Sequence, residues 1–358
     1  CVGKFIVRIR SFPGSECRLK VSKSKMLWYT SFYRNEGCRK DGQRMELKVL
    51  ENLQDNISKV MIGNEGTVKL LLAALLAEGH VLLEDVPGTG KTVLAKSLAK
   101  SVDAQFMRVQ FTPDLLPSDV TGLNYFNAKD GKFVFRKGPV FCNILLADEI
   151  NRATPKTQSS LLECMAENQV TVDGVTRTLG KPFFVIATQN PIETIGTFPL
   201  PEAQTDRFLM QVSMEAMTQE QELSMVERFL VREPLKELER VCGGEEITML
   251  QQQCRSVYVH RDLMKYMIET VHATRRHEKV ICGVSPRGTI AFVRAAQGFA
   301  MTEGREYVVP EDIKSVAVPV LAHRLSLSAR TEGQKGEKMV IREILETVKL
   351  PTEEWEKR

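Results

Sequence analysis

A glycine-rich segment carries the first chemical signal of this sequence. Residues 84–92 read Glu-Asp-Val-Pro-Gly-Thr-Gly-Lys-Thr, after an apolar run at 81–83 and before a helix-like run at 93–101. Glycines allow backbone N–H groups to turn toward an anion, and the N-terminus of the next helix attracts negative charge. Lys91 supplies a positive charge for the β- and γ-phosphates, and Thr92 a hydroxyl for Mg²⁺. The predicted phosphate-binding loop consists of Pro87, Gly88, Thr89, Gly90, Lys91, Thr92 and Val93.

One residue of this loop departs from the pattern G-x-x-x-x-G-K-[ST]. Asp85 stands at the first glycine position, which ends the strand and does not contact phosphate. We therefore still expect the loop around Gly88 and Gly90 to bind phosphate. The alternative, a glycine-rich turn before an ordinary helix, does not account for the Lys-Thr pair.

An acidic pair at the end of an apolar strand completes the pattern. Residues 144–147 are apolar and lead into Asp148 and Glu149, and Asp148 lies 57 residues after Lys91. Carboxylate and hydroxyl oxygens suit Mg²⁺, so Asp148 and Thr92 are predicted to hold the ion. Glu149 is predicted to orient or deprotonate a water molecule. The two motifs in this order predict binding and hydrolysis of a nucleoside triphosphate.

Asn190 is a further candidate because another apolar strand, at 183–187, leads into the polar residues Thr188, Gln189 and Asn190. In a parallel sheet it would lie beside Asp148 and Glu149 and could hold the attacking water near the γ-phosphate. In isolation, Asn190-Pro191 predicts only a turn that ends the strand. The nucleotide site favours the first interpretation.

Two arginines could stabilise charge on a transferring phosphoryl group. Arg207 precedes a predicted strand, and Arg287 opens a predicted helix. Arg152, directly after the acidic strand, is a weaker third candidate. A surface arginine or an ion pair at a helix end is the alternative for each, and the sequence does not separate these interpretations.

The elements that must position these residues alternate between strands and helices. Five short apolar strands are predicted at 81–83, 106–111, 143–147, 183–187 and 209–212. Helical patterns between them indicate a parallel sheet with helices on both faces. Asp-Gly pairs predict two hairpins, one joining 124–129 to 132–137 and one joining 169–172 to 175–179. The first hairpin is basic, and its apolar alternation at Phe133 and Phe135 predicts that one face packs down.

Helical periodicity continues after the last strand. It covers 219–230, 261–276, 286–302 and 310–325, with Gly or Pro between the segments. These segments predict a second, all-helical domain. The predicted organisation is a leader at 1–44, a nucleotide-binding α/β domain at 45–216, and a linker with a helical lid at 217–358.

Charge separates the leader from the rest of the chain. The 358 residues are 43% hydrophobic and carry a net charge of +4, as in a soluble globular protein. Residues 1–44 hold eleven Lys/Arg against three Asp/Glu, which leaves 38 against 42 for the remainder. The leader lacks helical or strand periodicity and begins with Cys, so Met45 is the expected start. A basic arm for nucleic acid or membrane is the alternative.

The composition also limits the compartment and the metals. The apolar run at 70–77 is too short to span a membrane. Eight cysteines without a C-x-x-C pair and five histidines without zinc spacing indicate reduced thiols and no structural metal. A cytoplasmic protein is expected.

These motifs, in this order, resemble those of AAA+ ATPases, and their sequences are most similar to those of the MoxR branch. The resemblance covers roughly residues 45–325. It includes the loop sequence Glu-Asp-Val-Pro-Gly, so Asp85 looks like a feature of the family. The most specific stretches are 110–119, 147–153, 156–158 and 198–204. The implied fold is an α/β P-loop NTPase with a parallel sheet flanked by helices, a β-hairpin insert and a C-terminal all-helical lid.

The resemblance implies a role for each motif residue. Lys91 and Thr92 look like the Walker A pair, and Asp148 and Glu149 like the Walker B pair, with ATP and Mg²⁺ as ligands. Asn190 looks like the residue called sensor 1.

The resemblance also implies an assembly. Arg207 resembles the arginine finger that acts in a neighbouring subunit's site, Arg287 resembles sensor 2 of the lid, and Ile62-Gly63 resembles the segment that contacts adenine. The two hairpins look like inserts that face the pore of a hexameric ring. MoxR proteins are similar in acting as chaperone-like ATPases, often beside partners with a von Willebrand factor A domain, and the client stays unknown.

Three alternatives remain open. A nucleic-acid-stimulated motor would use the same hairpins, but the remainder's negative charge and the lack of an appended DNA-binding motif count against it. A magnesium-chelatase-type motor subunit differs only in its partner. A nucleotide-dependent scaffold without turnover is disfavoured by the intact acidic pair.

Overall fold

The computed structural model describes residues 48–84, 88–190, 196–328 and 336–351 in full, and elsewhere only the backbone of 5–6, 20–21 and 40–47. The chain divides into two units, Cys1–Glu46 and Leu47–Arg358. In the first unit, β1 (Phe5–Ile6) pairs antiparallel with β2 (Lys20–Val21), a short pairing that the sequence pattern did not predict. The helix α2 begins at Lys40, inside the predicted leader, and the other leader residues lie outside the described residues. The sequence boundaries at 44/45 and 216/217 stay predictions.

A parallel sheet of five strands forms the centre of the second unit. Its strands follow the order β11-β3-β10-β7-β4. They are β3 (Val81–Glu84), β4 (Phe106–Gln110), β7 (Ile144–Asp148), β10 (Phe184–Gln189) and β11 (Met210–Val212). All neighbouring pairs are parallel, which confirms the predicted sheet. The carboxyl ends of all five strands therefore lie at one edge.

Alternate residues of the strands enter two separate apolar layers. Leu83, Leu146 and Ile186 pack into the layer that contains the helices α2 (Lys40–Ser58), α3 (Glu65–Leu76) and α4 (Lys91–Ser101). Leu145 and Val185 pack into the other layer, with α5 (Pro117–Thr121) and α6 (Pro155–Glu167). Burial on both faces explains why β3, β7 and β10 read as short continuous apolar runs. The expectation of a buried strand at 106–111 is wrong, because β4 lies at the edge of the sheet and exposes Met107, Arg108 and Gln110.

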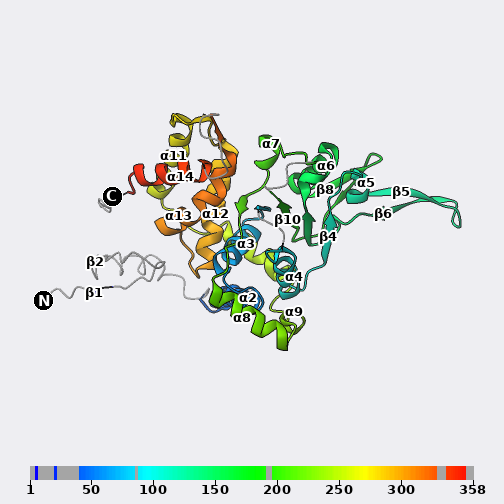
Figure 1. Ribbon diagram of the computed structural model, residues 1–358, viewed down its shortest axis with the longest axis horizontal. Helices are drawn as coiled ribbons and strands as arrows, with labels where there is room; N and C mark the ends of the chain where they lie inside the picture. Colours follow the sequence, from blue (N-terminus) through cyan, green and yellow to red (C-terminus); the bar gives the residue numbers. More distant parts are fainter. Residues whose placement is uncertain are drawn as a thin grey trace. The chain divides into compact units, whose positions relative to one another are not determined.

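Both predicted hairpins form. The strands β5 (Gly122–Asn127) and β6 (Lys132–Lys137) pair antiparallel and extend beyond the elements around them (Figure 1). Near their tip, Phe126 and Phe133 are 56% and 75% exposed and stack edge to face with centroids 5.5 Å apart. The expectation that this face packs down is confirmed at Phe135, which packs against Phe141, and is wrong at Phe133. The cause is the projection of the hairpin, which leaves no surface beneath its tip.

The second hairpin is tighter. The strands β8 (Gln169–Val172) and β9 (Val175–Thr178) are joined by Asp173 and Gly174 alone. These two residues have φ of 51° and 75°, the left-handed conformation that a two-residue turn requires. Asp173 accepts a hydrogen bond from Asn124 of β5 at 2.6 Å, so the two hairpins touch.

The described residues of the C-terminal region are mostly helical, with one short strand pair and an isolated bridge between Tyr258 and Tyr307. Its helices are α8 (Gln219–Val231), α9 (Pro234–Glu237), α10 (Gly244–Cys254), α11 (Arg261–Arg276), α12 (Pro286–Thr302), α13 (Pro310–Leu321) and α14 (Gly336–Thr347), with the 3₁₀ turn η2 (Ala322–Arg324). The strands β12 (Val280–Cys282) and β13 (Ser326–Leu327) pair antiparallel, so the lid is not purely helical. Val280-Ile281 is a β-branched pair, which favours extended backbone.

The lid and the sheet domain share one apolar layer. Phe292 and Ala296 of α12 belong to the same buried cluster as Leu71 of α3. An ideal Cβ on Gly298 would lie 2.4 Å from the carbonyl oxygen of Ala73, so α12 and α3 approach as closely as backbones allow. Among the described helices, none combines the length and the apolar character that a membrane crossing needs.

Candidate nucleotide-binding site

The phosphate-binding loop has the conformation that its glycines predict. Gly88 and Gly90 have φ of 89° and 91°, and α4 begins at the next residue, Lys91. An ideal Cβ on Gly88 has no heavy atom of the described residues within 4 Å, so there is open space beside the loop. Left-handed glycines before a helix N-terminus make a concave row of backbone N–H groups, which fits phosphate. Pro87 lies outside the described residues.

The segment Ile62-Gly63 lies close to this loop. It joins α2 to α3, and Gly63 has φ of 73°. The preceding Met61 is buried, and its methyl carbon is 3.7 Å from an ideal Cβ on Gly90. The structure therefore brings the segment expected near adenine to the side of the phosphate-binding loop.

Asp148 ends β7 and makes contacts with both neighbouring strands. Its Oδ2 accepts from Nη2 of Arg108 at 2.6 Å and from Nε at 3.2 Å. Its Oδ1 accepts from the hydroxyl of Thr188 at 2.6 Å. Arg108 belongs to β4 and Thr188 to β10, the strands on either side of β7. The carboxylate is thus fixed in the plane of the sheet edge.

Glu149 has an uncommon backbone conformation. Its φ and ψ of 55° and 50° lie in the left-handed region, which costs a non-glycine residue about 1 kcal/mol. Its N–H donates to the hydroxyl of Thr188 at 2.8 Å. Its Oε2 accepts from Nε2 of Gln110 at 2.7 Å and lies 3.1 Å from Nε of Arg152. Arg152, the weaker arginine candidate, therefore neutralises Glu149 in this structure.

Asn190 follows the strand that separates the loop from the acidic pair. It is buried and comes directly after β10, whose neighbours are β3 and β7. Gln189 pairs with Glu84, the last residue of β3. The sequence prediction that Asn190 lies beside the acidic strand end agrees with this placement, and its role stays a prediction.

The two predicted charge-stabilising arginines lie on connected segments. Arg207 is half-buried between α7 (Glu202–Thr205) and β11, and its Nη1 donates to the carbonyl oxygen of Leu162 at 2.9 Å. Arg287 is exposed in the first turn of α12. Their neighbours meet, since the hydroxyl of Ser285 donates to Asp206 at 3.4 Å. The structure thus brings together the two segments that carry Arg207 and Arg287.

Sequence reasoning missed three residues of this site. Arg108, Gln110 and Thr188 hold the two acids, as the distances above show. The signal for Gln110 and Thr188 is a polar side chain near or directly after the end of a predicted apolar strand, whereas Arg108 lies inside the predicted strand at 106–111. That signal identifies candidates, but the partner of each depends on the order of the strands.

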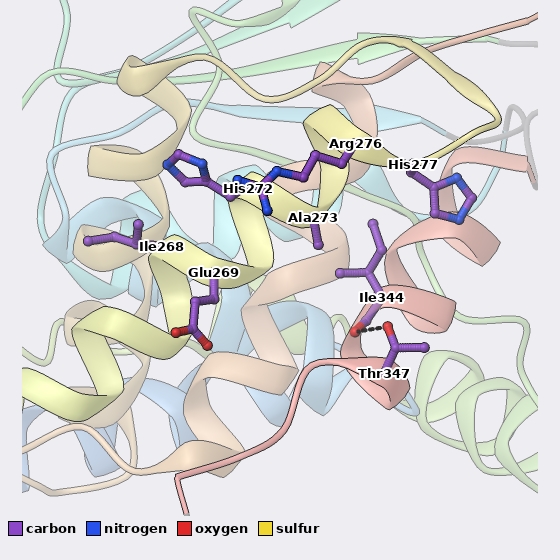
Figure 2. A pocket seen from close by; sticks show the side chains of 8 residues that line it. All are labelled: Ile268, Glu269, His272, Ala273, Arg276, His277, Ile344 and Thr347. Carbon is purple, nitrogen blue, oxygen red and sulfur yellow. Dashed lines mark hydrogen bonds between the residues drawn. The ribbon is translucent and has the colours of Figure 1, made fainter.

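A separate groove of about 600 Å³ opens on the lid between α11 and α14 (Figure 2). It is lined by Ile268, Ala273 and Ile344 beside Glu269, His272 and Arg276, among others. None of the predicted site residues lines it. The groove is therefore distinct from the nucleotide site.

Two domain families match the chain. The family described as "ATPase family associated with various cellular activities (AAA)" matches residues 80–210, and the AAA lid domain matches residues 272–344. The first match covers the phosphate-binding loop, both acids, Asn190 and Arg207. The second covers Arg287.

Individual proteins match over most of their length. The chain is 50% identical over 301 residues to the uncharacterized protein YeaC of Bacillus subtilis, covering 84% of this chain and 94% of that protein. It is 38% identical over 321 residues to Chaperone MoxR1 of Mycobacterium tuberculosis, covering 87% and 85%. It is 32% identical over 312 residues to Protein MoxR of Paracoccus denitrificans, covering 78% and 89%. The crystal structure of a proposed ATPase from Cytophaga hutchinsonii superposes with a TM-score of 0.81 at 36% identity, covering 91% of this chain and all of that one.

Proposed function

This chain belongs to the MoxR family of AAA+ ATPases, and we propose that it couples Mg²⁺-dependent ATP hydrolysis to the remodelling of a client protein. It is an ATPase with a chaperone-like role. The dependence on Mg²⁺, the assembly and the role of each residue belong to the proposal. One observation carries it: the glycine loop after β3 and the acids after β7 lie at the same sheet edge, separated only by β10 and Asn190.

The donor atoms at the sheet edge fit a magnesium ion. Thr92 offers a hydroxyl oxygen and Asp148 a carboxylate, both hard ligands of the type Mg²⁺ takes. Oδ2 of Asp148 already accepts two hydrogen bonds from Arg108, and Oδ1 accepts one from Thr188. A carboxylate has about four acceptor positions, so room for a cation remains. When bound, Mg²⁺ neutralises charge on the phosphate oxygens.

Each of the remaining site residues has its own role in hydrolysis. The backbone N–H groups of residues 88–93, with Lys91, bind the phosphates. Glu149 accepts a proton from the attacking water, which Asn190 orients. Arg287 and Arg207 of a neighbouring copy stabilise the charge that develops on the γ-phosphoryl group.

The assembly that this mechanism requires is a homo-oligomeric ring, with six copies as the expected number. Its hairpins β5–β6 and β8–β9 pass the motion of the lid to the client. The exposed Phe126 and Phe133 support contact with apolar protein segments, and the relative named a chaperone favours a protein client over nucleic acid. A partner with a von Willebrand factor A domain and a cytoplasmic location complete the proposal.

Glu149→Gln is the variant that tests the role of the acidic pair. We expect it to bind a fluorescent ATP analogue like the wild type, because glutamine keeps the size and the partners of Glu149. Turnover should fall by about 10²-fold or more, since the general base is lost. Glu167→Gln, at the exposed end of α6, is the matched control. Normal ATP turnover in Glu149→Gln would exclude Glu149 as the base.

A further inference from the structure

One buried arginine of the lid, Arg324, holds the loop that carries Arg207. The Arg324 side chain is 3% exposed. Its Nε donates to Oδ1 of Asp206 at 2.6 Å, and its Nη2 donates to the carbonyl oxygen of Phe208 at 2.6 Å. Its Nη1 donates to the carbonyl oxygen of Leu209 at 3.2 Å. A single guanidinium thus binds acceptors on both sides of Arg207. We call Arg324 with these three acceptors the clamp.

The clamp is fixed to the lid as well. Nη1 of Arg324 also donates to the carbonyl oxygen of Val320 in α13. The first turn of α12 packs against the arginine, since an ideal Cβ on Gly288 would lie 2.9 Å from Cδ of Arg324. Ser285, the N-cap of α12, donates to the other carboxylate oxygen of Asp206 at 3.4 Å. The clamp therefore joins the start of α12 and the end of α13 to the loop at 206–209.

Arg287 lies within electrostatic range of the clamp. Burial lowers the pKa of Arg324, the Asp206 carboxylate raises it, and the positive charge of Arg287 lowers it. Arg287 is directly before Gly288, which contacts the stem of Arg324. The clamp thus lies between the segments of both arginines assigned to phosphoryl transfer.

A buried ion pair is a poor way to stabilise a fold, because the cost of removing two charges from water offsets most of their attraction. An arginine is better suited to orienting the groups that it binds. Its planar fork of donors fixes the direction of several acceptors at once, which a lysine or an apolar side chain does not. The chemistry of the clamp therefore fits a positioning role better than a role in stability.

We propose that Arg324 is a positioning residue that locks the 206–209 loop to the lid, so that Arg207 and Arg287 move as one body. The inference rests on the proposed function of these two arginines. A lid movement that ATP causes in one subunit is then passed to the Arg207 that this subunit presents to its neighbour. Coupling between two nucleotide sites requires a shared element whose position depends on the state of both sites.

The test replaces Arg324 by lysine in the full chain. Arg324→Lys keeps the charge but not the planar fork, and Arg305→Lys is the matched control. Arg305 makes an ion pair with the buried Asp312 inside the lid and does not contact the 206–209 loop. Asp206→Asn serves as a second variant if Arg324→Lys does not fold.

The first readout separates KM from kcat. In Arg324→Lys we expect KM for ATP close to the wild-type value and kcat lower by about tenfold or more, because an interaction made in the transition state is lost. Mixing with Lys91→Ala subunits should restore turnover, since those subunits present a correctly held Arg207. Arg305→Lys should keep its turnover. A wild-type kcat in Arg324→Lys, or no recovery on mixing where Arg207→Ala does recover, would overturn the proposal.

A second readout is independent of the role of Arg207. Hydrogen exchange of a peptide covering residues 202–212 is followed with and without a non-hydrolysable ATP analogue. The wild type should show a nucleotide-dependent change, and Arg324→Lys should show faster exchange that no longer responds. If Arg207→Ala itself is not rescued by mixing, the trans role fails, and this measurement alone decides on the clamp. Identical exchange in the wild type and Arg324→Lys would refute it.

Discussion

His80 makes the stability of this protein dependent on pH. The ring is buried directly before β3, the strand that leads to the phosphate-binding loop. Nδ1 accepts from the N–H of Val185 at 3.0 Å, so Nε2 carries the proton and donates to the carbonyl oxygen of Met165 at 3.1 Å. A second proton on Nδ1 would face an N–H donor. Burial lowers the pKa of His80 from 6.5 to about 4, and the hydrogen bond to Met165 opposes this only in part.

The sign and the size follow from proton linkage. The unfolded chain protonates His80 as the pH falls through 6.5, whereas the folded chain does so only near 4. Between these values the unfolded state binds more protons, so the free energy of unfolding falls as the pH falls. The contribution of His80 is fully present above pH 6.5, and its loss reaches about 3 kcal/mol below pH 4. A loss of that size is a large part of the stability of an ordinary domain.

Urea unfolding of the wild type and His80→Gln measures this contribution. Glutamine does not titrate, so the variant should be less stable at neutral pH, where the two hydrogen bonds of His80 are disturbed. The gap between the two proteins should narrow by up to about 3 kcal/mol as the pH is lowered. His323 is also buried with a lowered pKa, but it is present in both proteins and cancels in the difference. Parallel pH profiles, or an NMR titration of His80 near 6.5, would refute the reasoning.

Two further variants probe the lid contact and the acid strand. Gly298→Ala places a Cβ 2.4 Å from the carbonyl oxygen of Ala73, so we expect the free energy of unfolding to fall by about 1–3 kcal/mol, and an unchanged urea midpoint would contradict the close approach of α12 and α3. Arg108→Ala removes a cation 2.6 Å from Asp148, so nucleotide binding should need less Mg²⁺. A titration of fluorescent-nucleotide binding with Mg²⁺ checks this, and an unchanged half-saturating concentration would show that Arg108 does not compete with the ion.

The fold could be predicted where local pattern and burial agree. Short apolar runs predicted β3, β7 and β10 because these strands are buried on both faces. Asp173-Gly174 predicted a two-residue turn because its left-handed conformation is required there. The prediction failed at Phe133, since alternation along a strand does not reveal whether any surface lies beneath it. The pair β12–β13 was missed because strands of two or three residues carry too little pattern.

Candidate residues of the site could be named one by one from the sequence, but not their partners. Lys91, Asp148 and Asn190 were singled out by their positions at the ends of elements. Gln110 was not, because β4 follows β3 in the chain but lies beside β7 in the sheet. Arg324 was hidden at the end of a predicted helix, 118 residues from its partner Asp206. Long-range pairs of this kind depend on tertiary packing that no local pattern contains.

One costly local feature of this chain lies where the nucleotide would act. Among the residues that the structure describes, five non-glycine residues have positive φ, and four of them end a helix or turn a hairpin. Only Glu149 combines this conformation with the end of a central strand, and the hydroxyl of Thr188 holds its N–H there. The buried Arg324 is a second unfavourable feature, placed between the lid and the loop of Arg207. The two apolar layers of the sheet supply most of the stability, so the polar contacts of Glu149 and Arg324 are not needed for folding and can serve to orient the residues around them. Each of these contacts also connects elements that an ATP-driven movement would shift.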